Sequence, residues 1–160
     1  METIGFIGLG IMGAPMALHL VAAGHQLFVH THGKLPDSVA ASTAVPCGSA
    51  EEVTRQADVV FTMVPDTPDV EAVLFGPGGV AAALQQPGGA RKTIVDMSSI
   101  SPMATKAFAQ RINALGADYV DAPVSGGEVG AKAASLTIMC GGDEAVFARV
   151  LPLLQTMGKH

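Results

Sequence analysis

The sequence lacks long hydrophobic runs and an excess of positive charge. Glycine, proline or a charged residue interrupts every apolar stretch before it reaches the roughly 20 residues that a membrane-spanning helix needs. The 9 Lys and Arg residues are dispersed and outnumbered by 14 Asp and Glu, for a net charge of −5. These absences argue against membranes and nucleic acid as partners. No cationic segment precedes the first apolar residues, so we expect no signal peptide and a cytoplasmic location.

Cysteine is scarce, and the usual catalytic and metal-binding motifs are missing. Cys47 and Cys140 are far apart with no CxxC pair, and we expect both to be buried thiols in a reducing compartment. The sequence contains no GxSxG elbow, no HExxH helix and no paired-carboxylate signature. His19, His25 and His30 have no carboxylate or cysteine partner at metal-ligand spacing. We therefore expect structural roles for these histidines and no metal site.

The composition is that of one globular domain, with 160 residues, 49% hydrophobic residues and a mean hydropathy of +0.41. Strand patterns alternate with helical patterns along the chain. After a first strand ending near Ile7, the predicted strands cover residues 26–31, 44–48, 58–64, 93–97, 118–124 and 136–140. The predicted helices follow Gly13 and cover residues 35–44, 69–75, 80–86 and 102–116, with a last one starting at Asp143. This alternation predicts an α/β, Rossmann-like, doubly wound fold with a mostly parallel sheet.

A glycine-rich turn joins the first strand to the first helix. Gly8 allows a tight turn, Gly10 lets the backbone approach a diphosphate, and Gly13 lets the helix pack close to the strand. Pro15 lies in the first helical turn, where its missing N–H costs nothing. The free N–H groups at the start of the helix favour an anion. The turn therefore predicts a dinucleotide-binding site.

The end of the second strand leaves the choice of cofactor open. In dinucleotide-binding folds, an acidic residue about 20 residues after the glycines binds the ribose 2′-OH of NAD, whereas Arg accommodates the 2′-phosphate of NADP. This chain has Thr31, His32, Gly33 and Lys34 in that region, with neither a carboxylate nor an arginine. The sequence therefore predicts NAD or NADP without deciding between them.

Five loops should meet at the carboxyl edge of the sheet, where ligands bind in open α/β folds. They cover residues 8–13, 31–34, 64–69, 98–101 and 125–128. Ser125, Gly126 and Gly127 combine a hydroxyl with unhindered N–H groups and could hold a carboxylate, or they could be an ordinary glycine turn. Ser98 and Ser99 could contact a ligand or cap the next helix.

Other side chains are expected to serve the fold. Asp58, Asp96 and Asp121 lie on or beside strands and are expected to make local hydrogen bonds. Ser49 and Glu52 fit a reciprocal capping box, and Pro152 should bend or break the last helix. The methionines that we expect to fill the core are Met12, Met16, Met63, Met97 and Met139.

Four motifs, in order, resemble those of the β-hydroxyacid dehydrogenase family. They are FIGLGIMGAPMA at residues 6–17, TMVP at 62–65, DMSSISP at 96–102 and DAPVSGG at 121–127. Four motifs in the same order are much more specific than any one of them, and the similarity extends over essentially the whole chain.

The resemblance implies a reversible hydride transfer between NAD or NADP and a small carboxylated aldehyde, with tartronate semialdehyde giving glycerate. A 3-hydroxyisobutyrate dehydrogenase activity shares every motif and stays open, as does a non-catalytic NAD(P)-binding module. Ser125, Gly126 and Gly127 would bind the substrate carboxylate. The residues that would bind the cofactor are Gly8, Leu9, Gly10, Ile11, Met12, Gly13, Thr31, His32, Val64, Pro65, Asp69 and Ser99.

The chain also departs from the family pattern. Family members are nearly twice as long, with a catalytic lysine on a connecting helix and an all-helical C-terminal domain beyond it. Residues 1–160 are therefore expected to form the NAD(P)-binding domain alone, without the lysine and without appreciable turnover. The full-length protein is expected to form a homo-oligomer.

Overall fold

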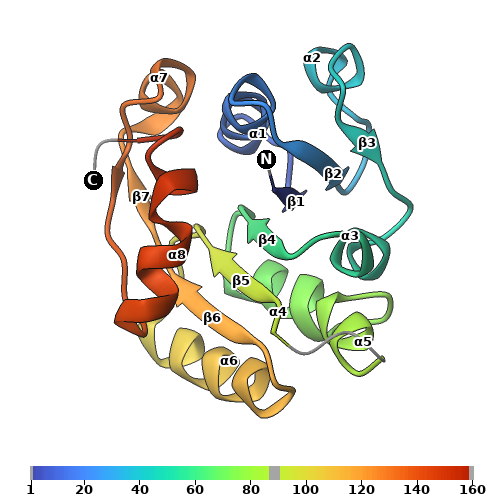
Figure 1. The fold of residues 1–160 in the computed structure, drawn as a ribbon, viewed down its shortest axis with the longest axis vertical. Coiled ribbons are helices and arrows are strands. Elements are labelled where there is room, and N and C mark those ends of the chain that lie inside the picture. The colour runs from blue at the N-terminus through green and yellow to red at the C-terminus, as the bar shows by residue number, and fades with distance from the viewer. Residues whose placement is uncertain (1, 87–90, 159–160) are drawn as a thin grey trace.

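The computed structural model describes residues 2–86 and 91–158, and its centre is one parallel β-sheet (Figure 1). The strand order is β3-β2-β1-β4-β5-β6, and every neighbouring pair is parallel. This is the doubly wound order. The chain adds strands on one side of β1 as far as β3, and then on the other side from β4 onward, so the order reverses between β1 and β4. The strands are β1 (Thr3–Ile7), β2 (Gln26–His30), β3 (Val45–Pro46), β4 (Val59–Thr62), β5 (Thr93–Asp96) and β6 (Asp118–Asp121). The predicted fold class is confirmed.

Helices cover both faces of this sheet (Figure 1). One face packs against α1 (Gly13–Ala22), α2 (Asp37–Ala40), α7 (Gly127–Ala133) and α8 (Glu144–Leu154). The other face packs against α3 (Ala50–Gln56), α4 (Thr67–Phe75), α5 (Val80–Leu84) and α6 (Pro102–Ala114). In the described residues, no helix has both the length and the hydrophobicity needed to cross a membrane.

The sheet has a hydrophobic core on each face because successive strand residues point to opposite sides. On β4, Phe61 belongs to the core beneath α1 and α8, whereas Val60 belongs to the core beneath α3 to α6. All four residues of β4 are buried. A continuous apolar run is typical of a strand covered on both faces, which explains why the sequence pattern located β4.

The chain leaves the parallel sheet after β6, which corrects the predicted strand 118–124. β6 ends at Asp121, and after Pro123 a two-residue strand, β7 (Val124–Ser125), pairs antiparallel with β8 (Thr137–Ile138). The predicted final strand 136–140 is therefore reduced to β8 and belongs to a separate two-stranded sheet. Pro123 has no N–H to continue the ladder of β6, which favours the change of direction.

Several helix predictions are corrected at their ends. The predicted helix 35–44 is only α2, and the helix predicted to start at Asp143 continues through Pro152 to Leu154. The Ser49 hydroxyl accepts from the Glu52 N–H at 3.1 Å, as a capping box requires. The Glu52 carboxylate instead accepts from the N–H of Gly48, one residue earlier than the reciprocal box predicts.

The two cysteines and one methionine are less buried than expected. Cys140 is exposed and Cys47 is partly exposed, so the prediction of two buried thiols is wrong. Met16 and Met97 are fully buried in the core, Met12 and Met63 are partly buried against it, and Met139 is 58% exposed. Met139 directly follows β8, on the segment that leaves the main sheet.

The cap of α8 provides a test of how local hydrogen bonds stabilise this fold. One carboxylate oxygen of Asp143 accepts from the N–H groups of Ala145 and Val146, at 2.9 and 3.3 Å. We expect Asp143→Ala to lower the free energy of unfolding by about 1 kcal/mol, because both donors lose their acceptor. Asp143→Asn keeps the acceptor and should retain most of that stability in urea unfolding. Equal losses in the two variants would mean that the charge, rather than the hydrogen bonds, stabilises the helix.

Candidate functional site

The turn between β1 and α1 is shaped by glycines that have no room for a side chain. Gly8 adopts φ +100°, and a Cβ there would collide with the Met63 carbonyl. A Cβ on Gly13 would collide with the carbonyl of Gly8, so α1 can begin this close to β1 only with glycine at that position. Gly10 differs, because a Cβ there would meet nothing within 4 Å. The backbone at Gly10 therefore faces open space.

The same turn presents free donors at the N-terminus of α1. The N–H of Gly8 is used in a hydrogen bond to the His30 carbonyl at 2.9 Å. Among the described residues, no acceptor meets the N–H groups of Gly10, Ile11 or Met12. The first turn of α1 contains no acidic residue that could occupy its positive end. This combination favours a bound anion.

A cavity of about 700 Å³ opens over this turn. Its walls come from the loops that follow β1, β2, β4 and β5, and from one side of α4. All twelve residues predicted to bind the cofactor lie on these walls. The complete set of wall residues is Gly8, Leu9, Gly10, Ile11, Met12, Gly13, Thr31, His32, Met63, Val64, Pro65, Asp69, Ala72, Val73 and Ser99. The position of the cavity, at the point where the strand order reverses, is typical of a nucleotide site.

The sequence prediction missed three of these wall residues. Met63 directly precedes the predicted Val64, while Ala72 and Val73 come from the middle of α4. The spacing of Asp69, Ala72 and Val73 is three and four residues, which places them on one face of a helix. This helical spacing was the sequence signal that could have identified Ala72 and Val73.

A second cavity, of about 330 Å³, shares part of its wall with the first. His32 and Val64 line both, and the second cavity continues past His30 toward Gly78 at the start of α5. The site is therefore an elongated groove that begins at the glycine turn and runs across the end of β2.

A buried network of hydrogen bonds fixes the far wall of the larger cavity. The Asp96 carboxylate, fully buried at the end of β5, accepts from the Thr62 hydroxyl at 2.9 Å, the Ser98 N–H at 3.0 Å and the Tyr119 hydroxyl at 3.3 Å. The Ser98 hydroxyl then accepts from the Val64 N–H at 2.9 Å. These bonds tie the carboxyl ends of β4 and β5 to each other and to the Tyr119 side chain of β6. The expected local role of Asp96 is confirmed.

The two serines after β5 have different positions. Ser98 is buried in the network described above, whereas Ser99 is exposed on the cavity wall. Ser101 caps α6, through a hydrogen bond from the Ala104 N–H to its hydroxyl at 3.4 Å. Neither Ser98 nor Ser99 caps the helix, so Ser99 is free to contact a ligand.

Ser125, Gly126 and Gly127 do not line the larger cavity. They lie at the junction of β7 and α7, in a segment that follows the carboxyl end of β6. All three are exposed, and Gly126 and Gly127 have positive φ values of +133° and +60°. The predicted carboxylate cradle therefore lies after β6, and its backbone is accessible to solvent.

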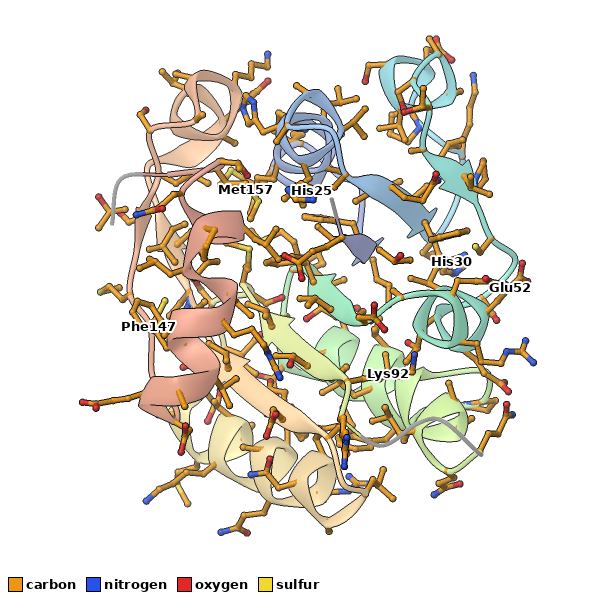
Figure 2. The ribbon with its side chains drawn as sticks, viewed as in Figure 1. His25, His30, Glu52, Lys92, Phe147 and Met157 are labelled. Carbon is orange, nitrogen blue, oxygen red and sulfur yellow. The ribbon has the colours of Figure 1, made fainter. Side chains whose placement is uncertain are left out.

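The histidines make hydrogen bonds within the fold. His25 and His30 lie at opposite ends of β2 (Figure 2). His25 Nδ1 accepts from the Glu2 N–H at 3.1 Å, and His30 Nδ1 lies 3.0 Å from the Cys47 carbonyl. His19 on α1 bonds through Nε2 to the Ala131 carbonyl on α7 at 2.7 Å. In residues 2–86 and 91–158, no group of three or more His, Cys, Asp or Glu side chains could hold a metal ion.

Comparison with known proteins agrees with this geometry. Residues 3–160 match the family described as the NAD binding domain of 6-phosphogluconate dehydrogenase. The chain belongs to this family. An NAD-binding domain accounts for the strand order, the glycine turn and the cavity at the reversal point.

Related proteins include several dehydrogenases. The NAD-binding domain is 57% identical to 2-hydroxy-3-oxopropionate reductase of Escherichia coli, with the match covering 98% of this chain and 52% of that protein. It resembles the structure of 3-hydroxyisobutyrate dehydrogenase from Mycobacterium tuberculosis at 39% identity and a TM-score of 0.87, over 99% of this chain and 52% of that one. A structure of Psf3 in complex with NADP+ and 2-OPP aligns at 30% identity and a TM-score of 0.88, over 97% and 54% of the two chains. The chain thus spans about half the length of these relatives.

One carboxyl group beside the buried network makes the stability of the NAD-binding domain depend on pH. Burial, with a further contribution from the charge of Asp96, raises the pKa of Asp121 from 3.8 to about 6. The folded chain therefore holds this proton more tightly than the unfolded chain does. Stability from this group is greatest below pH 4 and is lost as the pH rises through 6.

We expect Asp121→Asn to remove this dependence, because an amide does not ionise. The free energy of unfolding of the variant relative to the native chain should rise between pH 4 and pH 6 and then level off. Urea unfolding at pH 4, 5, 6 and 7 measures this difference. A difference that is constant across the four pH values would contradict the assignment.

Proposed function

We propose that the larger cavity binds NAD or NADP, with the diphosphate at the turn formed by residues 8–13. The observation that carries the proposal is the coincidence of three features at one place. The cavity lies where the strand order reverses, its floor is a glycine turn, and the N–H groups of Gly10, Ile11 and Met12 have no acceptor among the described residues. These features together fit a diphosphate, which requires several donors and close approach to the backbone.

The other walls fit the remaining parts of the dinucleotide. Thr31 and His32 would border the adenosine ribose, because they follow β2 and line the groove beside the turn. Val64 and Pro65 would contact the adenosine and the nicotinamide ribose, and Ser99 would contact the nicotinamide end. The apolar faces of Val64 and Pro65 suit the flat rings and sugar edges of such a ligand.

Either dinucleotide is compatible with the end of β2. The residues at 31–34 include no carboxylate to repel a 2′-phosphate and no arginine to bind one. The related Psf3 structure contains NADP+, whereas the family description names NAD. Cytoplasmic location and self-association of a full-length protein stay predictions from the sequence.

The proposed reaction is reduction of tartronate semialdehyde to glycerate. Tartronate semialdehyde is another name for 2-hydroxy-3-oxopropionate. The proposal is therefore supported by the 57% identity to 2-hydroxy-3-oxopropionate reductase over nearly all of this chain. When bound, the dinucleotide supplies the hydride, and this chain holds and orients it. Ser125, Gly126 and Gly127 would bind the substrate carboxylate through the hydroxyl and exposed N–H groups at the start of α7. The likeness to 3-hydroxyisobutyrate dehydrogenase supports a second candidate, oxidation of 3-hydroxyisobutyrate.

Gly10 allows cofactor binding to be tested without damage to the fold. A side chain at Gly10 would enter open space, so Gly10→Val should leave the urea unfolding midpoint unchanged. We expect its affinity for NAD+ and NADP+ to fall by more than about tenfold, because the side chain occupies the space where the diphosphate meets the backbone.

Gly141→Val is the matched control for this experiment. Gly141 is also exposed and a Cβ there meets nothing within 4 Å, but it lies outside the larger cavity. Isothermal titration calorimetry should give native affinity for this variant. Native affinity in Gly10→Val, or no binding of either dinucleotide by the native chain, would contradict the proposed site.

Steady-state rates of a full-length protein distinguish the candidate reactions. We expect kcat/KM for NADH-dependent reduction of tartronate semialdehyde to exceed kcat/KM for NAD+-dependent oxidation of 3-hydroxyisobutyrate. The opposite preference would favour the second candidate. Dinucleotide binding with no turnover of either substrate would instead favour a non-catalytic binding module.

A further inference from the structure

Two consecutive N–H groups of the glycine turn are held by two consecutive residues at the end of β2. The Gly8 N–H donates to the His30 carbonyl at 2.9 Å, which continues the parallel pairing of β1 with β2. The Leu9 N–H donates to the hydroxyl oxygen of Thr31 at 3.1 Å. The second bond therefore depends on the side chain of one residue.

This side-chain bond lies next to the donors that face the cavity. The Leu9 side chain is 3% exposed and packs in the core beneath α1, so the turn is fixed on its inner side. The next three residues have N–H groups with no acceptor among the described residues. The direction of those N–H groups depends on the backbone conformation at Leu9. The hydrogen bond from the Leu9 N–H to the Thr31 hydroxyl restrains that conformation.

The type of residue at this position matters because Thr31 also lines the cavity. A hydroxyl oxygen accepts the Leu9 N–H without adding a negative charge beside the proposed diphosphate. A valine has nearly the same shape but no acceptor, and would leave the Leu9 N–H without a partner at a partly buried position.

We propose that Thr31 is a positioning residue, which holds the glycine turn in the conformation that receives a diphosphate. The proposal rests on the proposed cofactor site, and it adds a role that precedes ligand binding. The Thr31 hydroxyl orders the turn in the free protein. Its effect on affinity should therefore be larger for ligands that carry a diphosphate than for adenosine.

The test compares Thr31→Val with Thr31→Ser in the 160-residue chain. Adenosine, ADP and NAD+ are titrated separately and followed by amide chemical shifts, which also tolerate weak binding. We expect Thr31→Val to lower the affinity for ADP and NAD+ by about fivefold, the typical effect of one hydrogen bond. The affinity for adenosine should stay within about twofold of the native value. Thr31→Ser keeps the acceptor and should match the native chain for all three ligands.

The free variants provide an independent measurement. The Leu9 amide proton should move upfield in Thr31→Val before any ligand is added, because it has lost its acceptor, and should keep its native shift in Thr31→Ser. If Thr31→Val does not fold, Thr31→Ala removes the same acceptor with a smaller side chain and is measured in the same way.

Three results would overturn the inference. Equal weakening of adenosine and ADP would mean that the hydroxyl contacts the ribose instead of positioning the turn. Unchanged ADP and NAD+ affinities, or an unchanged Leu9 amide shift, would mean that the hydrogen bond does not order the site. A native chain that binds neither ADP nor NAD+ would overturn the proposed cofactor site itself, a result distinct from the other two.

Discussion

The N-terminus of α1 rests directly on the end of β1, and the rest of the site depends on this contact. The contact requires glycine at position 13, because any side chain there would collide with the Gly8 carbonyl. Close approach brings the first N–H groups of α1 to the sheet edge, beside the loop after β4. Since β1 and β4 are neighbours from which the chain winds in opposite directions, no crossover helix of the described residues covers this edge. An anion can therefore reach the helix end.

The opposite wall is fixed by a buried carboxylate, which is a costly group to place there. Burial raises the pKa of Asp96, and three hydrogen bonds, from Ser98, Thr62 and Tyr119, act in the other direction. Because a partly satisfied network would destabilise the core, each of these donors is constrained to one geometry. Through the Ser98 hydroxyl the constraint reaches the N–H of Val64, on the cavity wall. The cavity therefore has one wall set by backbone contact and one set by side-chain hydrogen bonds.

Features that the sequence predicted correctly have local physical causes. The glycine turn and the apolar strand β4 were recognisable because backbone conformation and two-sided burial restrict the residue types at each position. The end of β6 was mispredicted because the apolar pattern continues through Val124, although Pro123 interrupts the ladder and Val124 pairs with β8 instead. The contribution of Val73 to the cavity depends on the rotation of α4 against the sheet, and the exposure of Cys140 depends on which elements cover it. Tertiary packing determines both.

A histidine remote from the cavity connects the two segments proposed to bind ligands. Hydride transfer needs the reacting atoms within about 3–3.5 Å of each other, so the dinucleotide and the substrate carboxylate must be held in a fixed relation. α1 begins at the proposed diphosphate turn, and α7 begins at Gly127 in the proposed carboxylate cradle. The 2.7 Å hydrogen bond from His19 Nε2 to the Ala131 carbonyl joins these two helices directly. His19 thus has a structural role, as predicted from the sequence, and it links the two helices that begin at the proposed anion sites.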